Sequence, residues 1–357
     1  MRALALSLVV SSSRRPAFFM TPENGLVLRE HRALFRCPKC AGAIDIGTDG
    51  VTCSACGEAF ELSDGIPLLF WPNDQHASKK DVTDAVRAFY EETPFPNYDD
   101  FDSVTSLIEK ARRGLYARLL DEQIPLGARV LECGCGTGQL SNFLSIAGRT
   151  VFGTDICLNS LKLGQAFRAK NDLRSVQFVQ MNLFRPVFPP GTFDVVVCNG
   201  VLHHTADPAL GFQSIASLVK PGGYILVGLY HRYGRLITNT RRLIFRLFGD
   251  RWQFLDPNLR EISTRAKRRA WFMDQYKHPH ESRHTIGEAV RWLGGAGMSL
   301  VKTIPRTRPP FSNLSEAERL FVPEMPGNAV ERWEAEFGMI LTGSREGGFF
   351  TLIGRKE

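Results

Sequence analysis

The sequence has no window of about 18 consecutive apolar residues, the length that a transmembrane helix needs. It has no Gly-X-Y repeat, and with 43% hydrophobic and 23% charged residues it lacks the composition of a disordered chain. These absences argue against a multi-pass membrane, collagen-like or largely disordered protein. The charge excess is small, since 44 Lys and Arg against 37 Asp and Glu give +7, which suits an anionic partner without requiring one. At about 150 residues per domain, the length of 357 residues predicts two domains.

Residues 1–29 give little sign of a folded unit. The apolar run over residues 3–10 follows a single arginine, but it is short and no small-residue cleavage pattern follows it. We therefore expect a disordered extension in preference to a signal peptide, with Met20 as an alternative start to Met1.

Four of the eight cysteines form two Cys-X-X-Cys pairs, Cys37 with Cys40 and Cys53 with Cys56, with twelve residues between the pairs. Each pair brings two thiolates to one side of a tight turn, and two such turns close a tetrahedral site without an open position. About 40 residues bury too little surface to fold alone, so a structural Zn²⁺ is the expected ligand. Paired disulfides and a redox motif are the alternatives.

The segments around these cysteines resemble a known family. Leu34–Cys40, Cys53–Gly57 and Asp64–Leu69 are similar to the short zinc-ribbon family that includes the activator subunit of tRNA methyltransferases. The resemblance covers residues 30–72 and implies a zinc ribbon that serves as a partner or an appended module. A protein partner bound through the ribbon is one expectation that follows.

From residue 128 onward, strand-like and helix-like segments alternate. Strands are expected over Ala128–Glu132, Thr150–Asp155, Val176–Gln180, Asp194–Cys198 and Tyr224–Tyr230. Helical patterns such as Gln139–Ala147 and Pro208–Val219 lie between them. This alternation predicts an α/β fold with a parallel sheet, whose ligands bind beyond the carboxyl ends of the strands.

The first of these strands ends in a turn in which Gly134, Gly136 and Gly138 follow Glu132. The dinucleotide fingerprint G-x-G-x-x-G holds a pyrophosphate, but here the third glycine comes one position early. Glu132 would repel a pyrophosphate and would suit a ligand with ammonium and sulfonium groups, as in S-adenosylmethionine. Asp155 lies 21 residues beyond Gly134 and can accept from both hydroxyls of a ribose.

With these residues, the chain resembles a class I S-adenosylmethionine-dependent methyltransferase, similar to the group that holds the ubiquinone and menaquinone enzymes. The matching segments are Val130–Gly138, Val151–Asp155, Phe193–Val196, Leu202–His204 and Lys220–Gly223. The resemblance implies a Rossmann-like seven-stranded sheet over residues 127–357. It also implies cofactor contacts from Glu132, Gly134, Gly136, Gly138, Asp155, Asn182, Leu183 and Asn199. Asn182 stands where the family often has an aspartate for the adenine amino group.

Residues 82–126 precede this domain. Val82–Tyr90 is expected to be helical, and Thr93–Tyr98 contains two prolines that favour an extended path. We expect a helical strap packed on the next domain or a lid over a ligand site.

His203 and His204 follow the fourth strand, where this fold borders its acceptor site. They are the candidates for handling a proton, and packed loop residues are the alternative. No catalytic residue is obligatory, because the sulfonium is already a good leaving group. The loop from Asn199 lacks the Asn/Asp-Pro-Pro-aromatic pattern of enzymes that methylate nucleic-acid amino groups, which disfavours that reaction.

An insertion over residues 231–284, the cap, and the residues that follow it carry the positive charge. Residues 232–308 hold 17 Lys and Arg against 6 Asp and Glu, a surplus of 11, which leaves the rest of the chain at −4. With its aromatic residues, the cap could clamp an anionic small molecule, track a nucleic acid or dock on an anionic membrane surface. A solvated helical face is the alternative.

The end of the cap is rich in polar side chains that could contact an acceptor: Asp274, Tyr276, His278, His280 and His284. Structural hydrogen bonding is an alternative, as is a metal site, although Pro279 interrupts any shared helical face of His278 and His280. Ser299–Pro305 and Gly347–Arg355 are expected to be the last two strands, paired antiparallel.

Three functional hypotheses follow. The first is methyl transfer to an oxygen or carbon of a small molecule, such as a quinone, a lipid-linked or a sugar-like metabolite. The second is RNA methylation, with the ribbon and the basic aromatic cap binding RNA. The third is a non-catalytic, cofactor-binding partner protein. The other four cysteines, expected as free thiols, indicate a reducing cytoplasm: Cys133, Cys135, Cys157 and Cys198.

Overall fold

The computed structural model describes residues 30–47, 50–73, 81–94, 103–262, 264–309, 311, 314–346 and 348–357, without side-chain detail for 342–346. The expected extension over 1–29 and residues 95–98 of the proline-containing segment lie outside the described residues.

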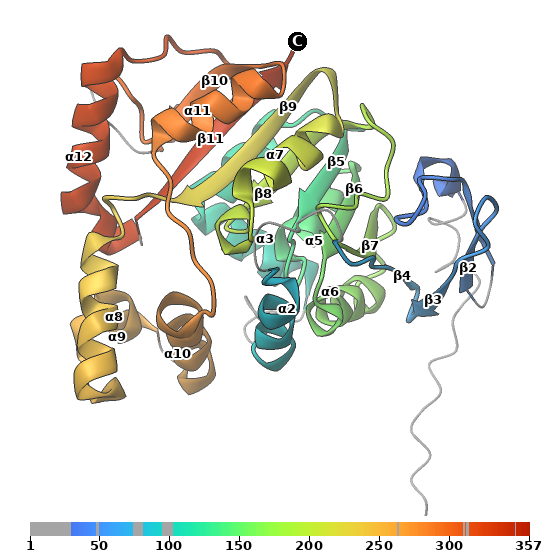
Figure 1. The fold of residues 1–357 in the computed structure, drawn as a ribbon, viewed down its shortest axis with the longest axis horizontal. Coiled ribbons are helices and arrows are strands. Elements are labelled where there is room, and N and C mark those ends of the chain that lie inside the picture. The colour runs from blue at the N-terminus through green and yellow to red at the C-terminus, as the bar shows by residue number, and fades with distance from the viewer. Residues whose placement is uncertain are drawn as a thin grey trace, which may run out of the picture.

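One sheet contains all of the predicted strands (Figure 1). Their bounds are β5 Arg129–Cys133, β6 Thr150–Asp155, β7 Val176–Met181, β8 Phe193–Asn199, β9 Val219–Tyr230, β10 Met298–Ile304 and β11 Phe349–Lys356. They lie in the order β7-β6-β5-β8-β9-β11-β10. Strands β5 to β9 are parallel, whereas β10 and β11 pair antiparallel with each other and β11 with β9. The α/β fold and the antiparallel closing pair are therefore confirmed.

The ribbon is continuous with this sheet. After a 3₁₀ turn at Arg32–Leu34, its strands are β1 Ile44–Ile46, β2 Gly50–Cys53, β3 Ala59–Ser63 and β4 Ile66–Leu69. Strand β4 runs parallel to β7 and pairs Leu68 with Gln180 and Leu69 with Met181. The seven strands expected over residues 127–357 are β5 to β11, and the four ribbon strands, which were expected as a separate unit, extend this sheet to eleven. The physical reason is that β4 satisfies the backbone groups of β7, which would otherwise be an open edge.

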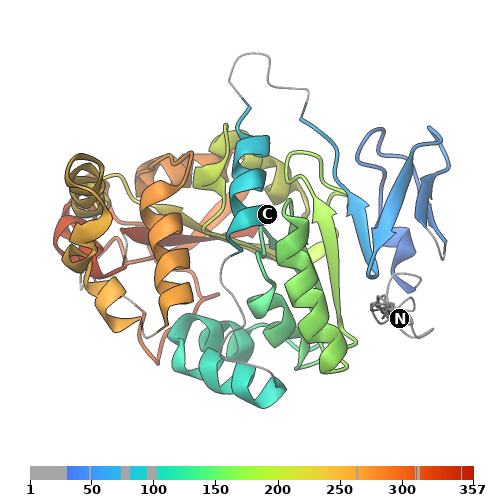
Figure 2. The same ribbon diagram turned by 90° about the horizontal axis from the view of Figure 1, so that it is seen from below.

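Helices cover both faces of the sheet (Figure 2). Helices α4 Leu115–Gln123, α5 Gln139–Ser145 and α6 Leu158–Lys170 share one core, and α7 Pro208–Ser217 and α11 Ile286–Gly295 share the other. Neighbouring residues of one strand pack in different cores: Val130 packs in the core with α4, α5 and α6, and Leu131 packs in the core with α7 and α11. This is the alternation that a strand buried on both faces requires.

The remaining helices belong to the segments between the strands. Helices α2 Thr83–Glu92 and α3 Val104–Arg113 lie between β4 and α4 in the chain, and a 3₁₀ turn η3 Leu202–His204 follows β8. The cap consists of α8 Leu236–Phe248, η4 Asp250–Leu255, α9 Pro257–Glu261, α10 Arg265–Phe272 and a π-helical turn η5 Met273–Lys277. Helix α12 Ala329–Glu346 lies between β10 and β11 and contacts α8. Among the helices described, none has the length and apolar character needed to cross a membrane.

Candidate active site and metal site

Close contacts determine the shape of the glycine turn after β5. Gly134 has a φ of 68°, and a Cβ there would lie 2.3 Å from the Val201 side chain, so only glycine fits. The N–H of Gly136 donates to Oδ2 of Asp155 at 2.8 Å, and the N–H of Cys157 donates to Oδ1 at 2.9 Å. The turn is thus joined to the end of β6, as adjacent parallel strands predict.

Glu132 supplies a second carboxylate at this edge of the sheet. It is buried, and its Oε2 accepts a short hydrogen bond from the Ser141 hydroxyl. Burial, together with the charge of Asp155, raises the pKa of Glu132 to about 7, although the hydrogen bonds from Ser141 act in the opposite direction. A cationic ligand beside Glu132 would favour its charged form.

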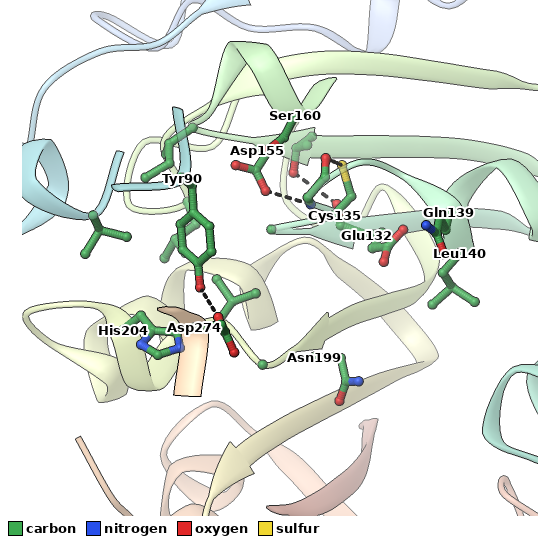
Figure 3. A pocket seen from close by; sticks show the side chains of 18 of the residues that line it. Tyr90, Glu132, Cys135, Gln139, Leu140, Asp155, Ser160, Asn199, His204 and Asp274 are labelled. Carbon is green, nitrogen blue, oxygen red and sulfur yellow. Dashed lines mark hydrogen bonds between the residues drawn. The ribbon is translucent and has the colours of Figure 1, made fainter. Parts of the chain in front are cut away.

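A cavity of about 570 Å³ opens at this turn (Figure 3). Glu132, Cys135 and Gln139 lie toward one side of it, His204 and Asp274 toward the other, and Tyr90 reaches in from α2. Its walls also include residues of α3, α4 and β11. The volume falls within the range of about 300–1,000 Å³ typical of small-molecule sites.

A buried hydrogen-bond network forms the wall opposite the glycine turn. Tyr90 donates to Oδ1 of Asp274 at 2.9 Å, and Nε2 of Gln275 lies 2.9 Å from Oδ2 of Asp274 and 2.8 Å from the Tyr230 hydroxyl. Nη1 of Arg235 donates to Oε1 of Gln275 at 2.7 Å. Burial raises the pKa of the Asp274 carboxyl above its ordinary value. The network connects α2, β9 and the cap, so these segments together hold this wall in place.

Of the two histidines predicted to handle a proton, His204 lines the cavity and His203 is not among the lining residues. Nδ1 of His204 lies 2.8 Å from the carbonyl oxygen of His280. A carbonyl can only accept, so Nδ1 carries the proton and Nε2 keeps a lone pair. Burial lowers the pKa of His204 to about 4, which leaves the ring neutral.

His203 is fully buried behind the cavity wall. Its Nδ1 accepts from the Tyr230 N–H at 3.3 Å, and the two rings pack with 4.0 Å between their centroids. Burial holds the pKa of His203 well below its usual value. These contacts match the packed-loop alternative for His203.

The five residues predicted to contact an acceptor do not all lie at the cavity. Asp274 lines the cavity, whereas Tyr276 packs in the core of the cap and donates to Oδ2 of Asp256 at 3.0 Å. His278 lies behind His204, with 3.7 Å between ring centroids, and burial lowers the pKa of His278 to about 3.

His280 and His284 are occupied by hydrogen bonds within the protein. Nε2 of His280 lies 3.1 Å from the Thr205 carbonyl oxygen. The His284 ring lies between Oε1 of Glu288 at 3.0 Å and the Ser282 hydroxyl at 2.9 Å. Both sets of contacts match the structural hydrogen bonding considered above.

Most of the residues predicted to hold the cofactor line the cavity: Glu132, Gly134, Gly136, Asp155, Asn182, Leu183 and Asn199. Gly138 instead starts α5 at a φ of 70°, where a Cβ would lie 2.3 Å from Phe178. Oδ1 of Asn182 accepts from the Phe184 N–H at 3.1 Å, and Nδ2 donates to the Trp71 carbonyl at 3.0 Å. Asn182 thereby joins the cavity to the residues just after the ribbon strand β4.

Sequence reasoning missed Tyr90, Tyr230, Gln275 and Phe349 as lining residues. The position of Tyr230 at the carboxyl end of a predicted strand was a usable signal. Phe349 begins an antiparallel strand and pairs with Tyr230, so it reaches the same edge from the opposite direction. No local pattern distinguishes Tyr90 or Gln275 from ordinary helix residues.

The four ribbon cysteines form a candidate metal site. All four sulfurs lie within 4.8 Å of one another, with 3.8 Å from Cys37 to Cys56 and 3.5 Å from Cys40 to Cys53. A tetrahedral zinc ion with bonds of about 2.3 Å requires sulfur separations of about 3.8 Å. The cysteines therefore fit a structural zinc ion.

Three arginines of the cap lie beside carboxylates of the protein. Arg235 and Arg242 pair with the buried carboxylate of Glu281 at 2.6 and 2.9 Å, and Arg241 lies 3.9 Å from Asp256. Several of the cap aromatics form a local core: Phe245, Trp252, Trp271, Phe272 and Tyr276. These cations and rings are turned inward.

Comparison with known proteins gives matches to the part of the chain that holds the parallel strands. Residues 131–227 match a family model described as a methyltransferase domain. An uncharacterized protein of Synechococcus is 29% identical over 255 residues, which are 64% of this chain and 61% of that protein. A ubiquinone biosynthesis O-methyltransferase of Bordetella pertussis is 35% identical over 127 residues, which are 34% of this chain and 48% of that enzyme. The chain spans about half the length of the curated relatives it matches.

Among solved structures, the chain is similar to the magnesium protoporphyrin IX methyltransferase of Synechocystis with bound SAH. The identity is 18%, the TM-score is 0.46, and the match covers 77% of this chain and 99% of that one.

Proposed function

We propose that this chain, which carries a class I S-adenosylmethionine-dependent methyltransferase domain, transfers a methyl group to an oxygen or carbon of a small acceptor. A quinone, a lipid-linked or a sugar-like metabolite belongs to this class. The main support is one cavity that has two carboxylates at its glycine turn and a neutral imidazole with a further carboxylate at its other side. The similarity to ubiquinone O-methyltransferases adds support for an oxygen acceptor.

The residues at the glycine turn suit the cofactor. When bound, S-adenosylmethionine supplies a methyl group on a positively charged sulfur. Glu132 lies where its carboxylate can face positive charge, and Ser141 fixes its orientation. Asp155 is held by the N–H groups of Gly136 and Cys157, and its remaining lone pairs are free to accept from ribose hydroxyls.

The residues on the other side suit an acceptor that loses a proton. A hydroxyl gives up its proton as its oxygen takes the methyl group, and Nε2 of His204 or the carboxylate of Asp274 can accept it. Tyr90 and Gln275 hold Asp274 in one orientation. In-line transfer needs alignment at about 3–3.5 Å and the exclusion of water, which α2 and the cap can provide by closing the cavity.

The structure supports the other two hypotheses less well. RNA methylation would use the ribbon together with the cations and aromatics of the cap, and several of these cap residues pair or pack internally. A non-catalytic role would not require the acceptor-side network of Asp274, Gln275 and Tyr230. Within this proposal the ribbon holds a structural zinc ion and remains available to a protein partner. The free thiols at Cys133 and Cys135 support a reducing cytoplasm as the compartment.

Calorimetric titration of the full chain with S-adenosylmethionine tests the cofactor assignment. Asp155→Ala should abolish binding, and its melting temperature measures the separate cost of leaving the N–H groups of Gly136 and Cys157 without their acceptor. Asp45→Ala, an exposed aspartate of the ribbon, is the matched control. Unchanged affinity in Asp155→Ala would contradict the assignment of Asp155 to the ribose.

The acceptor class is tested by incubating the protein with methyl-labelled S-adenosylmethionine and a fractionated cell extract. Label in a small organic product would support the proposal. Label in RNA would favour the second hypothesis, and intact cofactor binding without any transfer would favour the third.

A further inference from the structure

Helices α8 and α12 lie at the end of the molecule opposite the ribbon (Figure 1). Both helices expose large apolar side chains. On α8 they are Leu236, Leu243, Leu247 and Phe248, and on α12 they are Val330, Trp333, Phe337 and Leu341. We call these eight residues the apolar end. The two helices contact each other, although α12 lies almost a hundred residues later in the chain.

The fold itself does not explain this exposure. Leu243 is 55% exposed and Leu247 is 65% exposed, while Phe245 between them is buried in the core of the cap. On α12, Trp333 and Phe337 are more than half exposed, although Ala335 between them is buried. Each helix already has a face that packs inward, so its outer stripe is a second apolar face. Contiguous exposed apolar surface of this kind marks an interaction site.

The charge around α8 indicates what covers the apolar end. The sequence of α8 contains three arginines and no Asp or Glu. Arg246 on α8 and Arg251 just after it are exposed, and neither forms an ion pair with a described residue. A helix with an apolar face and unpaired arginines is typical of segments that lie in the interface of an anionic membrane.

The aromatic residues of α12 fit the same surface. The rings of Trp333 and Phe337 stack with 5.3 Å between their centroids, and tryptophan is enriched at the level of lipid headgroups. Glu334 beside them is exposed, so α12 adds apolar area together with negative charge. The electrostatic attraction therefore comes from α8.

We infer that the apolar end docks on a bilayer that contains anionic phospholipids. A second copy of the chain is the alternative occupant, and the sedimentation experiment below distinguishes it from a bilayer. Docking would also affect the cavity, since Nη2 of Arg242 on α8 donates to the Gln275 carbonyl at 2.7 Å. The helix that contacts lipid is thus bonded to the cavity wall. This inference does not depend on the proposed reaction.

Flotation of the full chain with phosphatidylcholine vesicles, with and without phosphatidylglycerol, tests the inference. The wild type should bind the anionic vesicles. Leu243→Glu with Leu247→Glu should weaken binding at least about tenfold, because each leucine loses the burial it gains in lipid. Leu126→Glu, a 76% exposed leucine outside both helices, is the matched control and should bind like the wild type.

The charge component is tested separately. Arg246→Gln with Arg251→Gln should weaken binding to anionic vesicles about 30-fold, since each arginine near such a surface contributes about a fivefold gain in affinity. High salt should weaken the wild type in the same way. All variants should bind S-adenosylmethionine as the wild type does, which separates this test from the failure of the proposed function.

Three results would overturn the inference. The first is a wild type that does not float with anionic vesicles. The second is a leucine double variant that floats as well as the wild type. The third is a dimer in sedimentation experiments that the leucine double variant abolishes without any effect on vesicle binding.

Discussion

Glu132 is a carboxyl that the fold keeps partly protonated near neutral pH, because burial raises its pKa to about 7. Binding a cation beside it favours the ionised form. The affinity for S-adenosylmethionine should therefore rise with pH up to about 7, approaching tenfold per pH unit, and level off above it. Calorimetry in buffers of different ionisation enthalpy measures the released proton. Glu132→Gln should bind more weakly and lose this pH dependence.

The stability of the free protein provides a check on this prediction. The folded pKa of Glu132, about 7, lies above its ordinary 4.5, so its contribution is fully present below pH 4.5 and is lost as the pH rises through 7. Glu132→Gln should be more stable than the wild type by about 3 kcal/mol at about pH 8, and equally stable near pH 4. Equal melting at both pH values would contradict the raised pKa.

The adjacent residues His203 and His204 are expected to have different roles, His203 in packing and His204 in catalysis. His204→Gln should lower kcat for a hydroxyl acceptor about 100-fold or more, as loss of a general base does, with cofactor affinity unchanged. His203→Phe keeps the ring but removes the acceptor for the Tyr230 N–H, so it should cost about 1–3 kcal/mol of stability and retain most of kcat. Equal losses of kcat in the two variants would contradict a specific role for His204.

The site residues that could be predicted are those whose place follows from a strand end. Glu132 and Asp155 come directly at the carboxyl ends of β5 and β6, and both line the cavity. The cap residues Tyr276 and His278 could not be placed in this way. Tyr276 lies in a core that the short elements of the cap form together, and His278 packs against rings of α2 and of the turn after β8. No periodic pattern in the sequence encodes either arrangement.

At the scale of elements, the strands were predictable because each is a short apolar run between turn residues. The predicted strand Thr150–Asp155 agrees with β6 at both ends. The pairing of β4 with β7 was not predictable, since nothing in Ile66–Leu69 specifies a parallel partner more than a hundred residues away. Which strand pairs with a sheet edge is determined by the tertiary structure, because it depends on which backbone groups are left without a hydrogen-bond partner.

The Glu91 side chain helps to hold α2 against the start of α6. The carboxylate of Glu91 accepts from the N–H groups of Leu158 at 2.8 Å and Asn159 at 3.2 Å, at the helix end where negative charge is favoured. Because α2 also carries Tyr90 into the cavity, Glu91→Ala should speed cofactor dissociation about fivefold, in line with the loss of about 1 kcal/mol for a helix cap.

Stopped-flow dissociation and hydrogen exchange of the α2 amides measure this effect. The exposed neighbour Glu92→Ala is the matched control and should exchange and dissociate like the wild type. Faster exchange in α2 without any change in cofactor dissociation would show that α2 does not close the cavity.

At the scale of the whole molecule, the ribbon and the methyltransferase strands share one sheet. Strand β4 pairs with β7, and the Asn182 side chain reaches from the cavity to the Trp71 carbonyl just after β4. A zinc ion at the four cysteines would therefore stabilise more than the ribbon. It would hold the strand that covers the edge of β7.

Removal of zinc should therefore weaken cofactor binding in the cavity. We expect one equivalent of zinc in the purified protein. Chelation or Cys53→Ser should lower both the melting temperature and the affinity for S-adenosylmethionine, because Asn182 loses its partner when β4 detaches. Cys157→Ser, at a buried cysteine outside the ribbon, should retain the zinc and serves as the control. If zinc is lost while cofactor affinity stays the same, then the ribbon is joined to the sheet without supporting its site.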